Sequence, residues 1–151
     1  MKEFSVRDII LFSQRIEQES YDFYMKAKEI LKDQDTQDLV HDLAQSELGH
    51  KARLTRLLNE DKPADSELDK DLNAESPAYE RLVNAPEINE KSTAEEILKT
   101  AHTREENTRD LYRMLISLTN IDAAIVKTFE DLVKQEEGHA NLLEKKLKKL
   151  H

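Results

Sequence analysis

The sequence predicts an all-α protein built as a bundle of four long helices, and three observations support this fold class. The 151 residues include only 2 Gly and 3 Pro, whereas a β-sheet protein needs turn residues far more often. Charged residues make up 36% of the chain and apolar residues 38%, a balance typical of amphipathic helices with solvated outer faces. Apolar residues also recur at three- and four-residue spacing through four segments, which is the period of an α-helix.

The first two helices are predicted from their boundary signals. The first runs from about residue 5 to 32, with Ser5 as its N-cap and Asp8 completing a short capping box. A polar break at 33–35 follows it, and the second helix runs from about 36 to 59. Because short connections join antiparallel neighbours in bundles, we expect these helices to form a hairpin.

The second hairpin follows a long crossover. Residues 60–91 hold all three prolines and many Asp, Glu and Asn residues, and we expect one short helix there, near Pro77–Val83. The third long helix runs from about 92 to 118, because the stretch from Ser92 to Glu95 fits a capping box. The fourth runs from about 121 to 150. A four-helix bundle with one long crossover accommodates this order.

Length, charge and cysteine content narrow the class. The chain, 1–151, is one domain by length. Its net charge is −9, whereas nucleic-acid-binding proteins normally carry a basic patch; the basic run 145–149 complements the dipole of the last helix. The absence of Cys excludes disulfides, thiolate nucleophiles and Fe–S clusters. Without an apolar stretch of about 18 residues or a visible signal peptide, we expect a cytoplasmic protein with no membrane or nucleic-acid partner.

The chain repeats one hairpin design. Glu17 is followed by Tyr24, and the same spacing recurs 88 residues later as Glu105 and Tyr112. A Glu-x-x-His motif occurs at 47–50 and again, 89 residues later, at 136–139. Hairpins with matching internal spacing place equivalent residues at one depth of a bundle, so we expect the four motifs to meet there.

Six polar residues occupy core-facing positions of the four helices: Glu17, Glu47, His50, Glu105, Glu136 and His139. Burying one unpaired carboxylate costs several kcal/mol, and four together would repel one another. A protein with a stability of about 5–15 kcal/mol cannot absorb that cost. Two divalent cations would neutralise the four carboxylates, and the two His side chains would complete the ligand set.

The ligand types indicate which metal is expected. Glu-x-x-His places both side chains on one helix face, so both can reach a single metal. Mixed carboxylate and imidazole ligation suits iron or manganese better than magnesium or calcium, and the lack of thiolates disfavours a structural zinc site. The set matches the pattern of di-iron and di-manganese carboxylate bundles. We predict two iron ions per chain, with manganese or zinc as alternatives.

Five neighbouring residues have two interpretations each. Tyr24 and Tyr112 lie two helical turns after the core-facing Glu17 and Glu105. They either donate hydrogen bonds to ligand carboxylates or only pack the core. His102 is either a partly buried His with its own partner or an extra ligand. Gly49 and Gly138 precede the two predicted His ligands. Since Gly inside a helix costs about 1 kcal/mol relative to Ala, their repetition indicates either close helix approach or inheritance from a duplicated hairpin.

With these motifs the chain resembles the ferritin-like superfamily and, within it, the rubrerythrin-like di-iron proteins. The strongest matches are segments 45–52 and 136–140. The resemblance implies a ferritin-like four-helix bundle of two repeated hairpins, in which the six core-facing polar residues are the metal ligands. By analogy, Glu47 and Glu136 would be bridging or semi-bridging carboxylates, although the spacing alone does not show which glutamates bridge.

The chain departs from those proteins at several places. It has no Cys, so it lacks the rubredoxin domain that supplies electrons in rubrerythrins. Thr108 stands where they carry a further Glu, which puts redox-linked iron movement in question. Leu48 stands where bacterioferritins often carry a haem-ligating Met, so no haem is expected. A crossover as long as 60–91 is also unlike the subunits of a compact cage, and this disfavours assembly into a large storage shell.

The resemblance implies a di-iron oxidoreductase in which an Fe(II) pair reacts with hydrogen peroxide or O2, as a peroxide scavenger under oxidative stress or as a ferroxidase. Turnover would need an external electron donor, and the expected assembly is a homodimer. Two alternatives stay open. One is non-catalytic iron binding or buffering, and the other is a structural module whose metal only stabilises the helices. No catalytic residue beyond the metal ligands is indicated.

Overall fold

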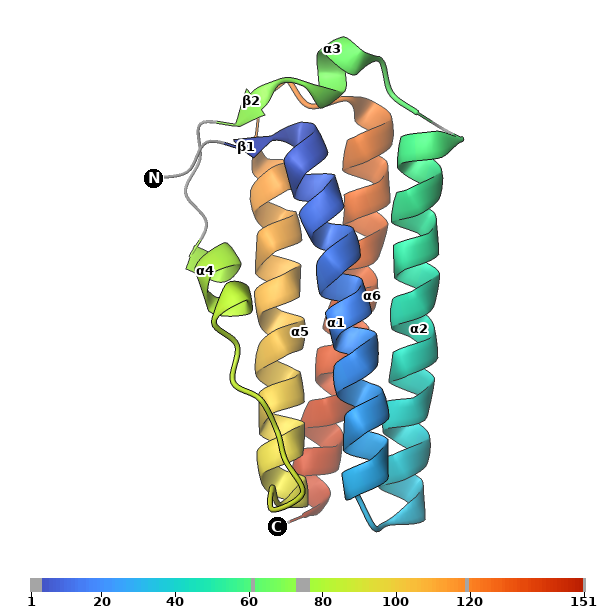
Figure 1. Ribbon diagram of the computed structural model, residues 1–151, viewed down its shortest axis with the longest axis vertical. Coiled ribbons are helices and arrows are strands. Elements are labelled where there is room, and N and C mark those ends of the chain that lie inside the picture. Colours follow the sequence, from blue (N-terminus) through green and yellow to red (C-terminus); the bar gives the residue numbers. More distant parts are fainter. Residues whose placement is uncertain (1–3, 61, 73–76, 119, 151) are drawn as a thin grey trace.

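The computed structural model describes residues 4–60, 62–72, 77–118 and 120–150. Four long helices form the bundle (Figure 1): α1 (Val6–Ile30), α2 (Gln34–Asn59), α5 (Ala94–Ser117) and α6 (Ala123–Lys149). α1 packs along α2, and α5 packs along α6. The predicted all-α bundle of two hairpins is confirmed.

The long crossover gives the bundle its helix directions. It leaves the end of α2 at the top of Figure 1 and descends beside α5 to the opposite end of the molecule, where α5 begins. α2 and α5 therefore run in the same direction, antiparallel to α1 and α6 (Figure 1). This arrangement brings the middle turns of all four helices to one level of the bundle.

The helix starts follow side-chain capping. Ser5 and Asp8 form the predicted capping box of α1. α2 starts two residues earlier than predicted because the Asp33 side chain accepts the hydrogen bond of the Thr36 N–H. Asp122 caps α6 by accepting from two backbone N–H groups. Short polar side chains at these positions satisfy N–H groups that a helix end leaves unpaired.

The capping box predicted for the third long helix was wrong by one residue. Thr93 is the N-cap of α5 and Glu96 is its partner. The Ser92 hydroxyl instead accepts a hydrogen bond from the backbone N–H of Asn89 at 3.0 Å. Ser92 thereby closes the preceding turn, which leaves the capping role to the next residue.

The crossover contains more structure than the sequence predicted. The short helix α4 (Pro77–Val83) lies where it was expected. The one-turn helix α3 (Asp65–Leu68) was not predicted, nor was the antiparallel pairing of β1 (Phe4–Ser5) with β2 (Asp71–Leu72). Residues 61 and 73–76 of the crossover lie outside the described residues.

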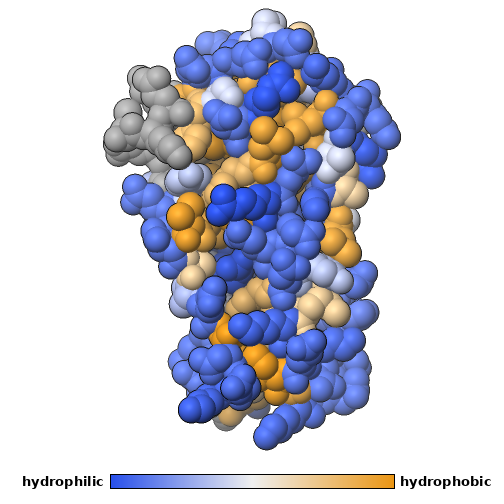
Figure 2. Space-filling model, viewed as in Figure 1, coloured by the Kyte–Doolittle hydropathy of each residue, from blue (hydrophilic) through white to orange (hydrophobic). Residues whose placement is uncertain are grey.

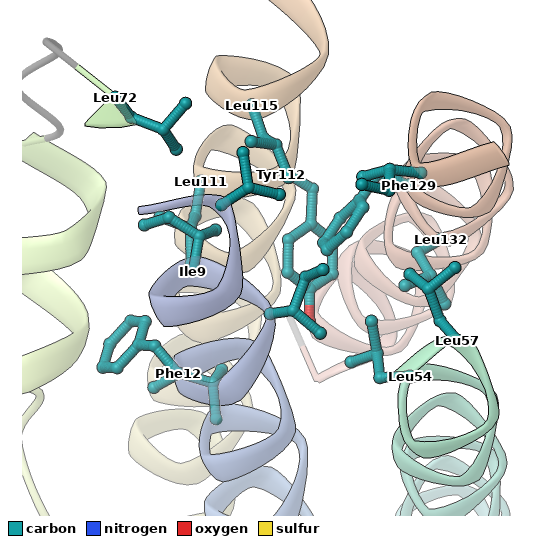
Figure 3. Close-up of a cluster of buried hydrophobic side chains, with 14 of the residues drawn as sticks. Ile9, Phe12, Leu54, Leu57, Leu72, Leu111, Tyr112, Leu115, Phe129 and Leu132 are labelled. Atoms are coloured by element: carbon teal, nitrogen blue, oxygen red, sulfur yellow. The ribbon is translucent and has the colours of Figure 1, made fainter. Parts of the chain in front are cut away.

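Two apolar clusters fill the two ends of the bundle. Near the top of Figure 1, the first cluster includes Ile9, Leu54, Leu111, Tyr112 and Phe129. Figure 3 shows the Tyr112 ring against Phe129, with the rings edge-on and their centroids 5.0 Å apart. The second cluster, at the other end, includes Tyr24, Leu43, Val40, Leu98 and Leu143. The six predicted ligands lie between these clusters, so apolar packing closes the site above and below.

The face of the molecule in Figure 2 is mainly hydrophilic, with scattered apolar patches. Within the described residues, no helix is long and apolar enough to cross a membrane.

Candidate metal centre

Each of the four long helices contributes ligand candidates at the same level of the bundle. α1 supplies Glu17, α2 supplies Glu47 and His50, α5 supplies Glu105, and α6 supplies Glu136 and His139. The four glutamates are at most 2% exposed, and His50 is 3% exposed. The His139 side chain retains 12% exposure. The cluster is therefore almost sealed from solvent, with its most open side at His139.

The six residues form three overlapping groups, of which one joins only Glu47, His50 and His139 and the other two contain four residues each. In the first four-residue group, ligand atoms of Glu17, Glu47, His50 and Glu136 all lie within 4.8 Å of one another. In the second, the same limit holds for Glu47, Glu105, Glu136 and His139. Glu47 and Glu136 belong to both four-residue groups. A geometry of two adjacent centres that share two carboxylates is what a dinuclear metal site needs.

The unsatisfied atoms show that the donor set fits metal ions. Both carboxylate oxygens of Glu136 are buried without a hydrogen bond, as are Glu47 Oε1, Glu105 Oε2 and His139 Nδ1. His50 Nδ1 is 3.0 Å from Glu136 Oε1, but this contact lacks hydrogen-bond geometry. Buried polar atoms normally have hydrogen-bond partners, so five atoms of one cluster that lack a partner require an explanation. A divalent cation at each centre would pair with them.

Two tyrosines hold the remaining carboxylate oxygens. The Tyr24 hydroxyl, from α1, donates to Glu105 Oε1 of α5 at 2.5 Å. The Tyr112 hydroxyl, from α5, donates to Glu17 Oε1 of α1 at 2.7 Å. Figure 3 shows the Tyr112 oxygen pointing along the bundle, away from the apolar cluster around its ring. Of the two interpretations of these tyrosines, the structure shows the hydrogen-bonding one, and the two bonds cross the bundle symmetrically.

Burial changes the acidity of the cluster. Desolvation, followed by the charge of Glu105, raises the pKa of Glu47 and Glu136 well above the usual glutamate range. For Glu105, burial raises the pKa, but interactions with Glu136, with His139 and with the Tyr24 hydroxyl outweigh it and lower the value. Burial lowers the pKa of His50, yet interaction with Glu17 raises it overall. Without metal, burial therefore favours the protonated forms of Glu47 and Glu136, and a binding cation would displace those protons.

Both His rings present Nδ1 to the cluster and Nε2 to the outside. His50 Nδ1 lies 3.2 Å from Glu17 Oε2, and its Nε2 forms a short hydrogen bond with Gln135 Oε1. His139 Nδ1 lies 3.1 Å from Glu47 Oε1, and its Nε2 lies 3.0 Å from Ser46 Oγ. The two rings stack with centroids 5.5 Å apart. A partner at Nε2 fixes the tautomer that leaves the Nδ1 lone pair free for a metal.

Ser46 and Gln135 were not predicted as site residues. Each immediately precedes a core-facing glutamate, so its side chain points about 100° away from the seam and reads as a surface position. The signal that could have found them is the repeat itself, since a hydrogen-bonding residue stands before the Glu in both Glu-x-x-His motifs.

Four other residues singled out in the sequence take ordinary roles. His102 Nδ1 lies 3.2 Å from Glu106, and His102 belongs to none of the ligand groups found in the described residues. The inference of close helix approach at Gly49 and Gly138 was wrong, because a Cβ built at either position meets no atom within 4 Å. Both glycines face solvent. The Thr108 hydroxyl donates to the Arg104 carbonyl of the preceding turn.

Comparison with known proteins agrees with this architecture. A solved structure of a protein from Thermotoga maritima, provisionally named a ferritin-like diiron-carboxylate protein, superposes with a TM-score of 0.81. The match covers 100% of this chain and 99% of that chain, at 21% sequence identity. The chain has a ferritin-like fold. No protein-family model matches the sequence, and no curated protein matches it. The ferritin-like bundle expected from the motifs is thus confirmed at the level of fold.

Proposed function

We propose that this ferritin-like chain binds two iron ions and acts as a di-iron oxidoreductase on hydrogen peroxide or O2. The observation that carries the proposal is the pair of buried four-residue groups sharing Glu47 and Glu136. Four carboxylates and two imidazoles match the charge and the ligand preference of two divalent iron ions. Glu17 and His50 would serve one ion, and Glu105 and His139 the other.

The chain's own groups would set the conditions for redox chemistry. Two bound Fe(II) ions would supply two electrons, enough to reduce one hydrogen peroxide to two waters. Tyr24 and Tyr112 fix the terminal carboxylates by hydrogen bonds, which limits ligand rearrangement. The apolar clusters on both sides keep bulk water away. His139, the most exposed member, marks the side from which a small oxidant would reach the centre.

The protonation states of the surrounding groups would suit a bound pair of metal ions. Glu47 and Glu136 release protons when metal binds, and the buried tyrosine hydroxyls stay protonated because burial, followed by the adjacent carboxylates, raises their pKa well above 10.0. They remain hydrogen-bond donors at neutral pH. Because the chain has no Cys, re-reduction would come from a separate electron donor.

The proposal is tested with anaerobically loaded Fe(II) protein in a stopped-flow instrument. We expect Fe(II) oxidation by one equivalent of hydrogen peroxide per two irons, at a rate far above that of free Fe(II). The Glu136→Met variant should lose this reaction, whereas Glu137→Met should retain it, because Glu137 pairs with Arg113 outside the ligand groups. Loaded wild-type protein that oxidises no faster than free Fe(II) with either peroxide or O2 would contradict the enzyme proposal and favour non-catalytic iron binding.

A further inference from the structure

A cavity lies on the outside of the bundle, and it is separate from the metal centre. It has a volume of about 360 Å³ and lies between α1, α5 and the crossover segment that follows α4. Its apolar wall consists of Phe23, Leu82, Val83, Ala85, Pro86 and Ile88. The charged residues that line it are Glu19, Asp22, Lys26, Glu87 and Arg104. None of the six predicted metal ligands contributes to this lining.

Arg104 is the unusual member of the lining. Its side chain starts from the buried face of α5, and the residue is 9% exposed. Its guanidinium lies over the Phe23 ring at 5.2 Å, and Nη2 donates to Ser20 Oγ at a long 3.4 Å. Nε is buried without any hydrogen-bond partner. Within the described part of the chain, Arg104 forms no ion pair.

A buried guanidinium without a counter-ion is costly, because its desolvation is repaid only by a paired and hydrogen-bonded anion. Glu47, a buried carboxylate of the metal cluster, interacts electrostatically with Arg104 but forms no ion pair with it, and the carboxylates that line the cavity are placed as follows. Glu19 pairs with Arg15 at 3.0 Å, and Asp22 accepts from Gln18 at 3.0 Å. Glu87 is exposed at the rim. The chain therefore places a cation at the wall of a cavity and leaves its Nε–H without an acceptor.

The charged part and the apolar part of the cavity lining together indicate the class of ligand. The planar guanidinium matches a carboxylate, which can accept two parallel N–H bonds. The apolar wall matches a hydrocarbon body, and the volume lies within the range of small-molecule sites. We propose that this cavity binds a small organic carboxylate, with the carboxylate on Arg104 and the apolar body against the segment Leu82–Ile88. Exposed Lys26 at the rim would attract the anion during its approach.

This inference does not depend on the metal centre, and its test uses metal-free protein. Equilibrium dialysis with benzoate as the probe measures binding, and benzamide serves as the neutral analogue of the same shape. We expect one saturable benzoate site per chain, with benzamide at least about tenfold weaker because it lacks the charge that pairs with Arg104. Arg104→Gln should weaken benzoate binding at least about tenfold. Arg109→Gln, which changes an arginine already paired with Asp110, should leave it unchanged.

A second readout needs no variant. In a ¹H–¹⁵N NMR titration of the wild type, benzoate should shift the Arg104 Nε–H signal together with the backbone signals of Leu82–Ile88. The proposal is overturned by the absence of saturable binding, by equal binding of benzamide, by an unchanged Arg104 signal, or by benzoate that binds Arg104→Gln as tightly as wild type. Binding seen only after iron loading would also overturn it, since the metal ions would then be the site. A failed peroxide assay would leave these measurements unaffected.

Discussion

Replacing Glu136 by Met should stabilise the metal-free protein while abolishing metal binding. Glu136 is fully buried, and neither of its carboxylate oxygens has a hydrogen bond. Its neighbours keep partners without it, because His50 Nδ1 still faces Glu17 at 3.2 Å. The substitution therefore removes an uncompensated polar group and creates no new one. Met has a similar volume and a good helix propensity.

The magnitude follows from the cost of burying a polar group that has no hydrogen-bond partner. Such a group costs about 1–3 kcal/mol, and an apolar residue of similar volume removes that cost. For a chain of this length, about 1 kcal/mol shifts Tm by about 3 °C. We therefore expect the Tm of metal-free Glu136→Met to exceed that of wild type by about 3–9 °C.

The assay is thermal unfolding followed by circular dichroism at 222 nm, in chelator-treated protein at pH 7.5. Glu105→Met is the matched comparison. It removes the acceptor of the Tyr24 hydroxyl and leaves a buried donor unpaired, which costs about 1–3 kcal/mol. Its Tm should therefore lie below that of Glu136→Met by about 3 °C or more. A metal-free Glu136→Met protein that melts at or below the wild-type temperature would refute the reasoning.

Three further predictions concern pH, the tyrosine contacts and the helix glycines. The pKa values of Glu47, Glu136 and His50 are raised in the folded protein, so their contribution to stability is present at low pH and is lost as pH rises through the folded values. The Tm of metal-free protein should therefore fall as pH rises above the usual glutamate range, and a flat or rising profile in a thermal scan would contradict this. Tyr112→Phe removes the hydrogen bond to Glu17. Competitive titration with a chelator should therefore show a metal affinity that is about 10–100-fold weaker than in wild type. An unchanged affinity would show that this contact does not position the Glu17 carboxylate. Gly138→Ala adds a Cβ that meets open space, so it should raise Tm by about 2–3 °C through helix propensity; a lowered Tm would reveal a steric need for Gly.

Most of the fold, and the meeting of the six candidate ligands at one level of the bundle, could be predicted from the sequence. Both depend on periodic and repeated features of the sequence. Helical spacing placed the four long helices, and the 88- and 89-residue offsets placed Glu105 and Glu136 opposite their counterparts. The polar character of seam positions carried the metal hypothesis, because such positions are normally apolar. The metal identity and the ligand roles stay predictions.

The features that sequence reasoning missed depend on tertiary contacts without a period. The pairing of Phe4 with Leu72 joins distant segments, and two-residue strands leave no alternation to read. Ser92 and Thr93 are both acceptable N-caps, and only the turn at Asn89 decides between them. Gly49 was misread because a helix glycine has no side chain whose surroundings the pattern could indicate. Arg104 next to a predicted ligand looked like an ordinary charged residue until its burial was known.

The central claim is that the buried cluster binds two metal ions, and elemental analysis tests it most directly. Wild type, Glu136→Met and the control Glu137→Met are loaded with Fe(II) under anaerobic conditions, desalted and measured for iron per chain. We predict about two irons in wild type and in the control, since Glu47 and Glu136 join two ligand groups, and fewer than about half an iron in Glu136→Met because both groups lose a shared ligand. Fewer than about half an iron in wild type, or equal iron in wild type and Glu136→Met, would contradict the account.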